Sequence, residues 1–305
     1  MVRKQLYVYL FSLLSLTACS CKTLPGGSHN ASATVPTSPQ DTVHIPGSVI
    51  VLFHGFQDRV SALDNIKSEL AQTFPDTHVV AFQRDETQPI AAQAYSTYQD
   101  LQTAGLAYKS LVFLGISAGG VVAIETYDRC AYQTDIKGII AYHSPLEGAP
   151  CISTMRRMLP PGTPAAYLSP PYQEIANLMQ CKTVCDLNPQ HNFVYAFKSK
   201  LNRVSIPILT VASRLCHHSH IRDTGIGKLV ESIAAQQSQN PDVILDSLVG
   251  HIVHDGLIPL ESQIANGSPN SMITPFIESE IHHFRDPSPQ AMQAMKQAIR
   301  NYFGA

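Results

Sequence analysis

Charge is scarce in this chain, and neither sign dominates. Aspartate, glutamate, lysine and arginine make up only 14% of the 305 residues, and the formal net charge is −2. Proteins that neutralise nucleic-acid phosphates carry a basic excess, so we expect no nucleic-acid partner. The apolar run from Leu6 to Leu16 is also too short for a permanent membrane-spanning helix, which needs about 20 apolar residues.

The first residues have the layout of an export signal. A basic start is followed by the apolar run and by small residues before Cys19. The letters LTAC that end at Cys19 resemble a bacterial lipobox. This resemblance implies that residues 1–18 are removed and that a lipid on Cys19 anchors the chain in the bacterial cell envelope. Ser20 implies sorting to the outer membrane, and the alternative is an ordinary signal peptide cleaved after Ala18.

Residues 19–47 differ in composition from the rest of the chain. Between residues 22 and 46 they are rich in Pro, Gly, Ser and Thr and have hardly any large apolar side chain. Such a segment cannot bury enough surface to offset its ordering entropy. We therefore predict a lipidated N-terminus and flexible tether over 19–47. Residues 48–305 have no internal repeat and are long enough for one domain with one core.

Short apolar runs alternate with segments of helical period along this domain. Runs of this kind are typical of strands buried on both faces of a parallel sheet. The alternation predicts an α/β fold with a doubly wound, mostly parallel sheet, closed by a helix over SPQAMQAMKQAIRNYF. The expected strands cover residues 48–56, 78–82, 110–116, 136–142, 206–213 and 271–277.

Residues 150–200 break this alternation. Prolines at 160, 161, 164, 170 and 171 predict irregular structure there, followed by a possible short helix over EIANLMQ. Apolar side chains such as Met158 and Tyr167 favour a lid over an acyl-binding cleft, against the alternative of a plain surface loop.

The segment Gly115-Ile116-Ser117-Ala118-Gly119 carries the strongest chemical signal. It follows a predicted strand and precedes a predicted helix, the context in which a G-x-S-x-G sequence forms a sharp turn that exposes a nucleophile. Ser117 is therefore the predicted nucleophile. The backbone NH of Ala118, at the helix N-terminus, is one expected donor to an oxyanion.

The first predicted strand ends in His54-Gly55-Phe56. A glycine here lets the backbone turn toward the site, and the NH of Phe56 is the second expected oxyanion donor. We expect His54 to hold this loop by a hydrogen bond and to take no part in proton transfer.

A serine hydroxyl needs a histidine base, and the base needs an acid. In proteins with the G-x-S-x-G turn, the three residues follow in the chain order serine, acid, histidine. Asp255 and Asp223 are the candidate acids. His282 and His283 follow the last predicted strand, and the length of the turn after that strand favours His282 slightly over His283.

Four segments together resemble the bacterial lipase and esterase branch of the α/β-hydrolases. They are HGF at 54, GISAGG at 115, HSPLEGAP at 143 and HDGLIPLES at 254, and the resemblance covers roughly residues 48 to 303. It implies an α/β-hydrolase fold with a lid-like insertion, and it implies that Asp255 is the acid, because that branch places its acid in an Asp-Gly-hydrophobic-hydrophobic-Pro loop. The sequence departs from the branch at Ile116, where such lipases commonly have His.

No cofactor or metal is expected. The run Cys216-His217-His218-Ser219-His220 is rich in metal-binding types, but adjacent residues rarely converge on one ion, so we predict a polar loop. A zinc site from Cys181, Cys185 and His191 lacks a second cysteine pair. In an exported chain these cysteines are candidates for disulfides, with no pairing determined by the sequence.

The function predicted from these residues is hydrolysis of carboxylic esters by a serine hydrolase of lipase or esterase type, with an acyl ester or lipid-like substrate. A thioesterase or cell-envelope deacylase uses the same three groups and is the first alternative. A non-catalytic binding lipoprotein on the same scaffold is the second. The oligomeric state is left open.

Overall fold

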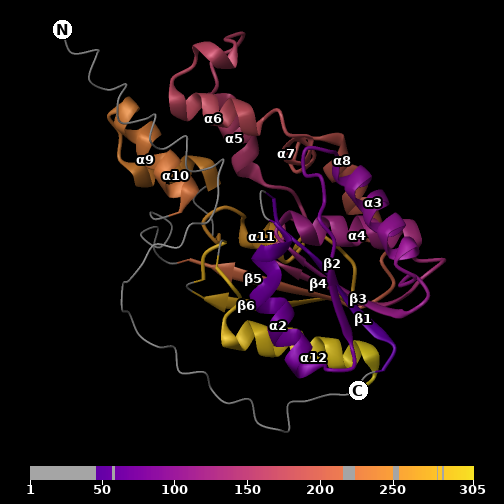
Figure 1. The fold of residues 1–305 in the computed structure, drawn as a ribbon. Helices are drawn as coiled ribbons and strands as arrows, with labels where there is room; N and C mark the ends of the chain where they lie inside the picture. The colour runs from indigo at the N-terminus through magenta and orange to yellow at the C-terminus, as the bar shows by residue number, and fades with distance from the viewer. Residues whose placement is uncertain (1–45, 57–58, 216–223, 250–253, 280, 284) are drawn as a thin grey trace, which may run out of the picture. The chain divides into compact units, whose positions relative to one another are not determined.

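Six strands form one parallel sheet in the computed structural model, which describes residues 46–56, 59–215, 224–249, 254–279, 281–283 and 285–305 (Figure 1). The strands lie in the order β2-β1-β3-β4-β5-β6, and every neighbouring pair is parallel. The strands are β1 (Ser48–Phe53), β2 (His78–Ala81), β3 (Ser110–Ile116), β4 (Asp135–Tyr142), β5 (Ile208–Arg214) and β6 (Ile273–Ser279). The predicted doubly wound parallel sheet is confirmed.

Helices connect these strands. They are η2 (Val60–Leu63), α2 (Asp64–Thr73), α3 (Ile90–Thr103), α4 (Ala118–Cys130), α5 (Pro150–Met158), η3 (Ala165–Tyr167), α6 (Pro170–Leu178), α7 (Lys182–Asp186), α8 (Asn192–Leu201), α9 (Gly225–Gln237), α10 (Pro241–Val249), α11 (Leu260–Gln263) and α12 (Pro289–Phe303). Within the described residues, no helix is both long enough and apolar enough to cross a bilayer.

Alternating side chains of the central strands bury two apolar layers, because successive residues of a strand point to opposite faces of the sheet. Ile50 and Leu52 of β1 pack in the layer that contains α2 and α12. Val49 and Val51 pack in the layer that contains α3, α4 and α8. This double burial explains why the central strands are continuous apolar runs. It also holds the carboxyl ends of β3 to β6 rigidly side by side.

The prediction that the prolines exclude regular structure is wrong for 170 and 171, whereas most of the possible short helix over EIANLMQ lies in α6. Pro150 begins α5, and Pro170 and Pro171 form the first turn of α6. Proline is well tolerated there, because the first turn of a helix needs no intrahelical NH and the fixed φ of proline suits it. The prolines at 160, 161 and 164 lie between α5 and η3.

Helices α5, α6, α9 and α10 contact one another, and we call them the four-helix group. Helix α10 packs on α5 and α9, and α6 packs on α5 and α9. The group therefore combines a segment that follows β4 with a segment that follows β5. The export signal, the predicted tether up to residue 45 and the rival acid Asp223 lie outside the described residues.

Candidate active site

Ser117 occupies the turn between β3 and α4 in a strained backbone conformation. Its φ of 53° and ψ of −127° are rare for a residue with a side chain. The turn is held because the Ser117 NH donates to the Tyr142 carbonyl over 2.8 Å. Glycines provide the space: a Cβ at Gly115 would lie 2.4 Å from the Gly119 carbonyl, and one at Gly120 would lie 2.0 Å from the Ser144 hydroxyl.

The side chain of Ser117 meets a histidine from the far end of the domain. His283 Nε2 lies 2.8 Å from Ser117 Oγ, and His283 Nδ1 lies 2.8 Å from Asp255 Oδ2. A carboxylate only accepts hydrogen bonds, so Nδ1 carries the hydrogen and Nε2 is left as an acceptor for the serine hydroxyl. This is the tautomer that a general base requires.

Asp255 lies fully buried in a tight turn that follows the excursion from β5. Its Oδ1 accepts from the backbone NH groups of Leu257, over 3.0 Å, and Ile258, over 2.7 Å, which leaves Oδ2 for His283. Burial raises the pKa of Asp255, but the charges of His283 and His143 and these hydrogen bonds outweigh burial. The net pKa is therefore below the ordinary 3.8, and the group is a carboxylate at neutral pH.

The preference for His282 over His283 is corrected by this geometry. His282 is partly exposed, and its Nε2 accepts from Arg285 Nε over 3.1 Å, whereas His283 contacts both Ser117 and Asp255. The backbone decides between the two neighbours, because the His283 NH donates to the Asp255 carbonyl over 2.8 Å and so turns this ring toward the serine.

The two expected oxyanion donors belong to segments that follow β3 and β1. Ala118 is the first residue of α4, so its NH is one of those that a helix leaves without an intrahelical partner. Phe56 lies in the turn just beyond β1. The first turn of α4 packs on the end of β1 so closely that a Cβ on Gly119 would lie 2.2 Å from the Phe53 carbonyl oxygen.

His54 supports this loop from behind, as expected. Its ring is fully buried, Nδ1 lies 3.0 Å from the Gly55 carbonyl and 2.9 Å from Glu86 Oε1, and Nε2 accepts from the Arg84 NH over 3.3 Å. The guanidinium of Arg84 also donates to the His54 carbonyl.

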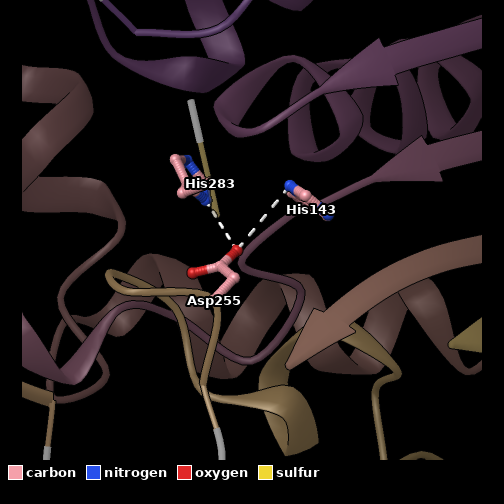
Figure 2. Close-up of side chains that lie close together, drawn as sticks. All are labelled: His143, Asp255 and His283. Carbon is pink, nitrogen blue, oxygen red and sulfur yellow. Dashed lines mark hydrogen bonds and ion pairs between the residues drawn. The ribbon is translucent and has the colours of Figure 1, made fainter. Parts of the chain in front are cut away.

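Two buried residues that the sequence interpretation did not assign lie behind Asp255. His143, directly after β4, has Nδ1 4.0 Å from Asp255 Oδ2, and its Nε2 lies 3.2 Å from Glu278 Oε1 on β6. Figure 2 shows the carboxylate of Asp255 between the rings of His143 and His283. The position of His143 directly after a predicted central strand, at the carboxyl edge of the sheet, is the sequence feature that could have indicated it.

His143, Asp255 and His283 are also close enough to be considered as ligands of a metal ion. The separation of 2.8 Å between His283 Nδ1 and Asp255 Oδ2 is a hydrogen-bond distance. Two ligands of one tetrahedral zinc ion lie about 3.3 Å apart, given zinc–ligand distances near 2.0 Å. The geometry therefore fits a hydrogen-bonded pair.

The four cysteines within the described residues, Cys130, Cys151, Cys181 and Cys185, are all free thiols. Cys181 donates to the Glu86 carbonyl and Cys185 to the Met179 carbonyl. Cys216, with the neighbouring histidines, lies outside the described residues, as does Cys19.

The sequence matches no family model and none of the curated proteins. The fold is similar to that of solved structures. The mature lipase BlEst2 of Bacillus licheniformis matches with a TM-score of 0.51 and 12% identity over 83% of this chain and 91% of that chain. A metagenomic carboxyl esterase matches with a TM-score of 0.53 and 16% identity over 92% and 82%.

A structure of the metagenome-derived lipolytic enzymes LipS and LipT matches with a TM-score of 0.52 and 10% identity, over 85% of this chain and 95% of that chain. At these identities the similarity concerns the arrangement of the backbone. Each comparison covers more than 80% of this chain. Taken with the parallel strand order and the turn at Ser117, these matches show that the chain has the α/β-hydrolase fold.

Proposed function

We propose that this chain is a serine hydrolase that cleaves carboxylic esters through an acyl-enzyme, with Ser117 as nucleophile, His283 as base and Asp255 as acid. The observation that carries the proposal is the unbroken contact from Ser117 Oγ through His283 to Asp255, with 2.8 Å at each step. The matched folds named lipase, carboxyl esterase and lipolytic enzyme support an ester substrate.

The reaction proceeds in two acyl transfers. His283 Nε2 takes the hydroxyl proton as Ser117 Oγ attacks the carbonyl carbon, and the NH groups of Phe56 and Ala118 bind the oxyanion that forms. Collapse of this intermediate breaks the bond to the alcohol, which leaves with the proton from His283. Water then attacks the acyl-serine by the same route and releases the acid. Asp255 stabilises the imidazolium in both halves.

Replacement of the nucleophile tests this function. We expect Ser117→Ala to lower turnover of a p-nitrophenyl acyl ester by about 10⁴- to 10⁶-fold and to abolish labelling by a fluorophosphonate probe. The matched control is Ser110→Ala, at the opposite end of the same strand β3. Its hydroxyl donates to Asp135 over 2.7 Å, and its loss should leave turnover unchanged. Retained turnover in the Ser117 variant would reject the proposal.

The substrate is proposed to be an acyl ester or a similar lipid, with the four-helix group acting as the lid over the acyl chain. A panel of p-nitrophenyl esters and matching thioesters of increasing acyl length measures this preference. Higher kcat/KM on thioesters than on esters of equal length would assign the chain to the thioesterases.

We also propose that the enzyme is exported and anchored in the bacterial outer membrane by a lipid on Cys19, the first residue after cleavage of 1–18. The basis is the sequence up to Ser20 alone. Mass spectrometry of the membrane-extracted protein should show a diacylglycerol on Cys19, and Cys19→Ala should release activity from the membrane fraction. An unmodified N-terminus would reject the anchor.

A further inference from the structure

A second histidine with a carboxylate on each side lies behind the candidate active site. His143 is fully buried at the end of β4, Asp255 is fully buried, and the side chain of Glu278 is 4% exposed. The imidazole nitrogens face different carboxylates, Nδ1 toward Asp255 at 4.0 Å and Nε2 toward Glu278 at 3.2 Å. The buried ring of His143 therefore lies between the carboxylates of Asp255 and Glu278.

The position of this ring is fixed by the backbone and by stacking. The His143 NH donates to the Val211 carbonyl of β5 over 2.8 Å, and φ is 48°, in the left-handed region. Its ring stacks on Tyr142 with 3.9 Å between centroids, and its centroid lies 6.0 Å from that of His283, with 26° between the two ring planes. A left-handed conformation at a buried residue with a side chain is strain of the kind that collects at functional sites.

The charges around His143 favour an imidazolium. A neutral ring offers one N–H, so it would turn a lone pair toward one of the two carboxylates, whereas an imidazolium offers an N–H to each. Neither nitrogen has a well-aligned hydrogen bond among the described residues, so the attraction is that of charges at short distance. Two buried carboxylates without a cation between them would repel strongly.

The groups that face the ring come from every neighbouring element. They are Tyr142 on its own strand, Glu278 on β6, and Asp255 and His283 from the two loops. The Tyr142 hydroxyl is bonded to the Arg285 carbonyl over 3.0 Å. Burial and the charges of Glu278 and Asp255 raise the pKa of Tyr142, so this phenol stays neutral.

We propose that His143 is a positioning residue for the reaction at Ser117: as an imidazolium between Glu278 and Asp255, it holds the Asp255 carboxylate ionised and aimed at His283. This assignment rests on the proposed function. His143 touches no reacting atom in this role and acts through Asp255. Glu278 in turn holds His143, and its Oε2 accepts from the Ser288 NH over 3.4 Å at the start of α12.

The electrostatics of the two carboxylates agree with this role. Burial raises the pKa of Glu278, but the close contact with His143, the hydrogen bond from Ser288 and the charge of His143 outweigh burial, so its pKa lies below the ordinary 4.5. The charge of His143 also contributes to the lowered pKa of Asp255. Both acids therefore remain ionised at neutral pH although they are buried.

The charge state of the ring is tested without reference to activity. Imidazole ¹⁵N spectra of the wild-type protein at pH 7, assigned by comparison with His143→Gln, should show both nitrogens of His143 protonated. Glu278→Gln removes one carboxylate and should return the ring to a neutral tautomer. A neutral ring in the wild-type protein would overturn the proposal, even if Ser117 proves to be the nucleophile.

The positioning role is tested by kinetics. His143→Gln should lower kcat by about 10- to 100-fold, the cost of a misplaced catalytic group, with KM changed less than about threefold. The matched control is His78→Gln, at the exposed start of β2 in the same sheet. Its kcat should equal that of the wild type. An unchanged kcat in His143→Gln overturns the proposed role of His143. The loss of turnover in Ser117→Ala tests the proposed function independently of this result.

A double variant separates charge balance from packing. His143→Gln alone leaves Glu278 buried without its cation, whereas the double variant with Glu278→Gln leaves two neutral amides. We expect the double variant to melt above His143→Gln by at least about 3 °C. If the double variant melts below both single variants, the two losses of packing simply add, and the charge pairing is overturned. If His143→Gln fails to fold, the wild-type ¹⁵N spectra still decide the ring's charge.

Discussion

The carboxyl edge of the sheet and the four-helix group are built in different ways. At the sheet edge, backbone hydrogen bonds set the positions of the site residues: the NH groups of Ser117, His143 and His283 each donate to a carbonyl of another segment over 2.8 Å. In the four-helix group, helices meet through apolar side chains such as Ile175 and Leu245, with exposed side-chain bonds such as that from Gln237 to Tyr172.

This difference indicates which region can shift in position at low cost. A position fixed by the backbone of adjacent strands moves only if the sheet moves, whereas helices packed side by side shift by small amounts at low cost. The proposed chemistry lies at the sheet edge. Adjustment to substrates of different length is expected in the four-helix group.

The largest predicted effect is a difference in kcat between variants of two neighbouring histidines at the sheet edge. His283→Gln should lower kcat by about 10⁴-fold, because it removes the base that contacts Ser117. His282→Gln should change kcat less than about threefold, because that ring bonds to Arg285. Steady-state kinetics on one p-nitrophenyl ester measures both. The reverse order of effects would return the base to His282.

A smaller effect is expected from glycines in the two regions. Gly119→Ala should destabilise the fold by about 2–3 kcal/mol or more, because the new Cβ would overlap the Phe53 carbonyl, and it should abolish turnover. Gly162→Ala, between α5 and η3, meets no atom within 4 Å and has a φ of 72°. Its cost should be about 1 kcal/mol, with turnover kept. Urea unfolding gives both free energies, and equal costs would contradict the comparison.

A core truncation in the four-helix group should affect substrate binding more than chemistry. Leu245 in α10 is 3% exposed, and Leu245→Ala should cost about 2–4 kcal/mol. We expect KM for long-chain esters to rise several-fold while kcat for p-nitrophenyl acetate stays within about twofold. An equal fall of kcat on both substrates would mean that this group takes part in positioning the reacting groups.

The smallest effect is a change in acid stability. The pKa of Glu278 is lower in the folded protein than its ordinary 4.5, so the unfolded chain binds more protons near that pH and stability rises with pH. This contribution is complete above about pH 4.5 and is lost as the pH falls through the folded pKa. Melting temperatures between pH 3 and 7 should fall less steeply with acid in Glu278→Gln. An equal slope would mean that Glu278 is not held as an anion.

The sequence predicted the sheet well because its strands are apolar runs with clear ends. The run from Ser110 to Ile116 coincides with β3, and the glycines around Ser117 mark a turn that no other residue type fits. The sequence also singled out Asp255, which the structure places against His283, since its loop has a recognisable pattern and its carboxylate accepts from the NH groups of the next residues in the chain.

Other features depend on contacts that no local pattern carries. His282 and His283 are adjacent in a loop without periodicity, and the choice between them depends on a bond to the Asp255 carbonyl. Helix α6 begins with two prolines, which look like breakers until the cap position is known. Glu278 lies one residue beyond the strand predicted to end at 277, and its contact with His143 requires β4 and β6 to come together around β5.

The peptide unit between Tyr142 and His143 is hydrogen-bonded on both sides, to Ser117 and to strand β5. The carbonyl of Tyr142 accepts from Ser117, and the NH of the same peptide unit, on His143, donates to Val211 of β5. Because a peptide group is planar and rigid, tilting it to lengthen one bond strains the other. The amide hydrogens of Ser117 and His143 should therefore exchange with solvent together, and at the slow rate of the innermost sheet.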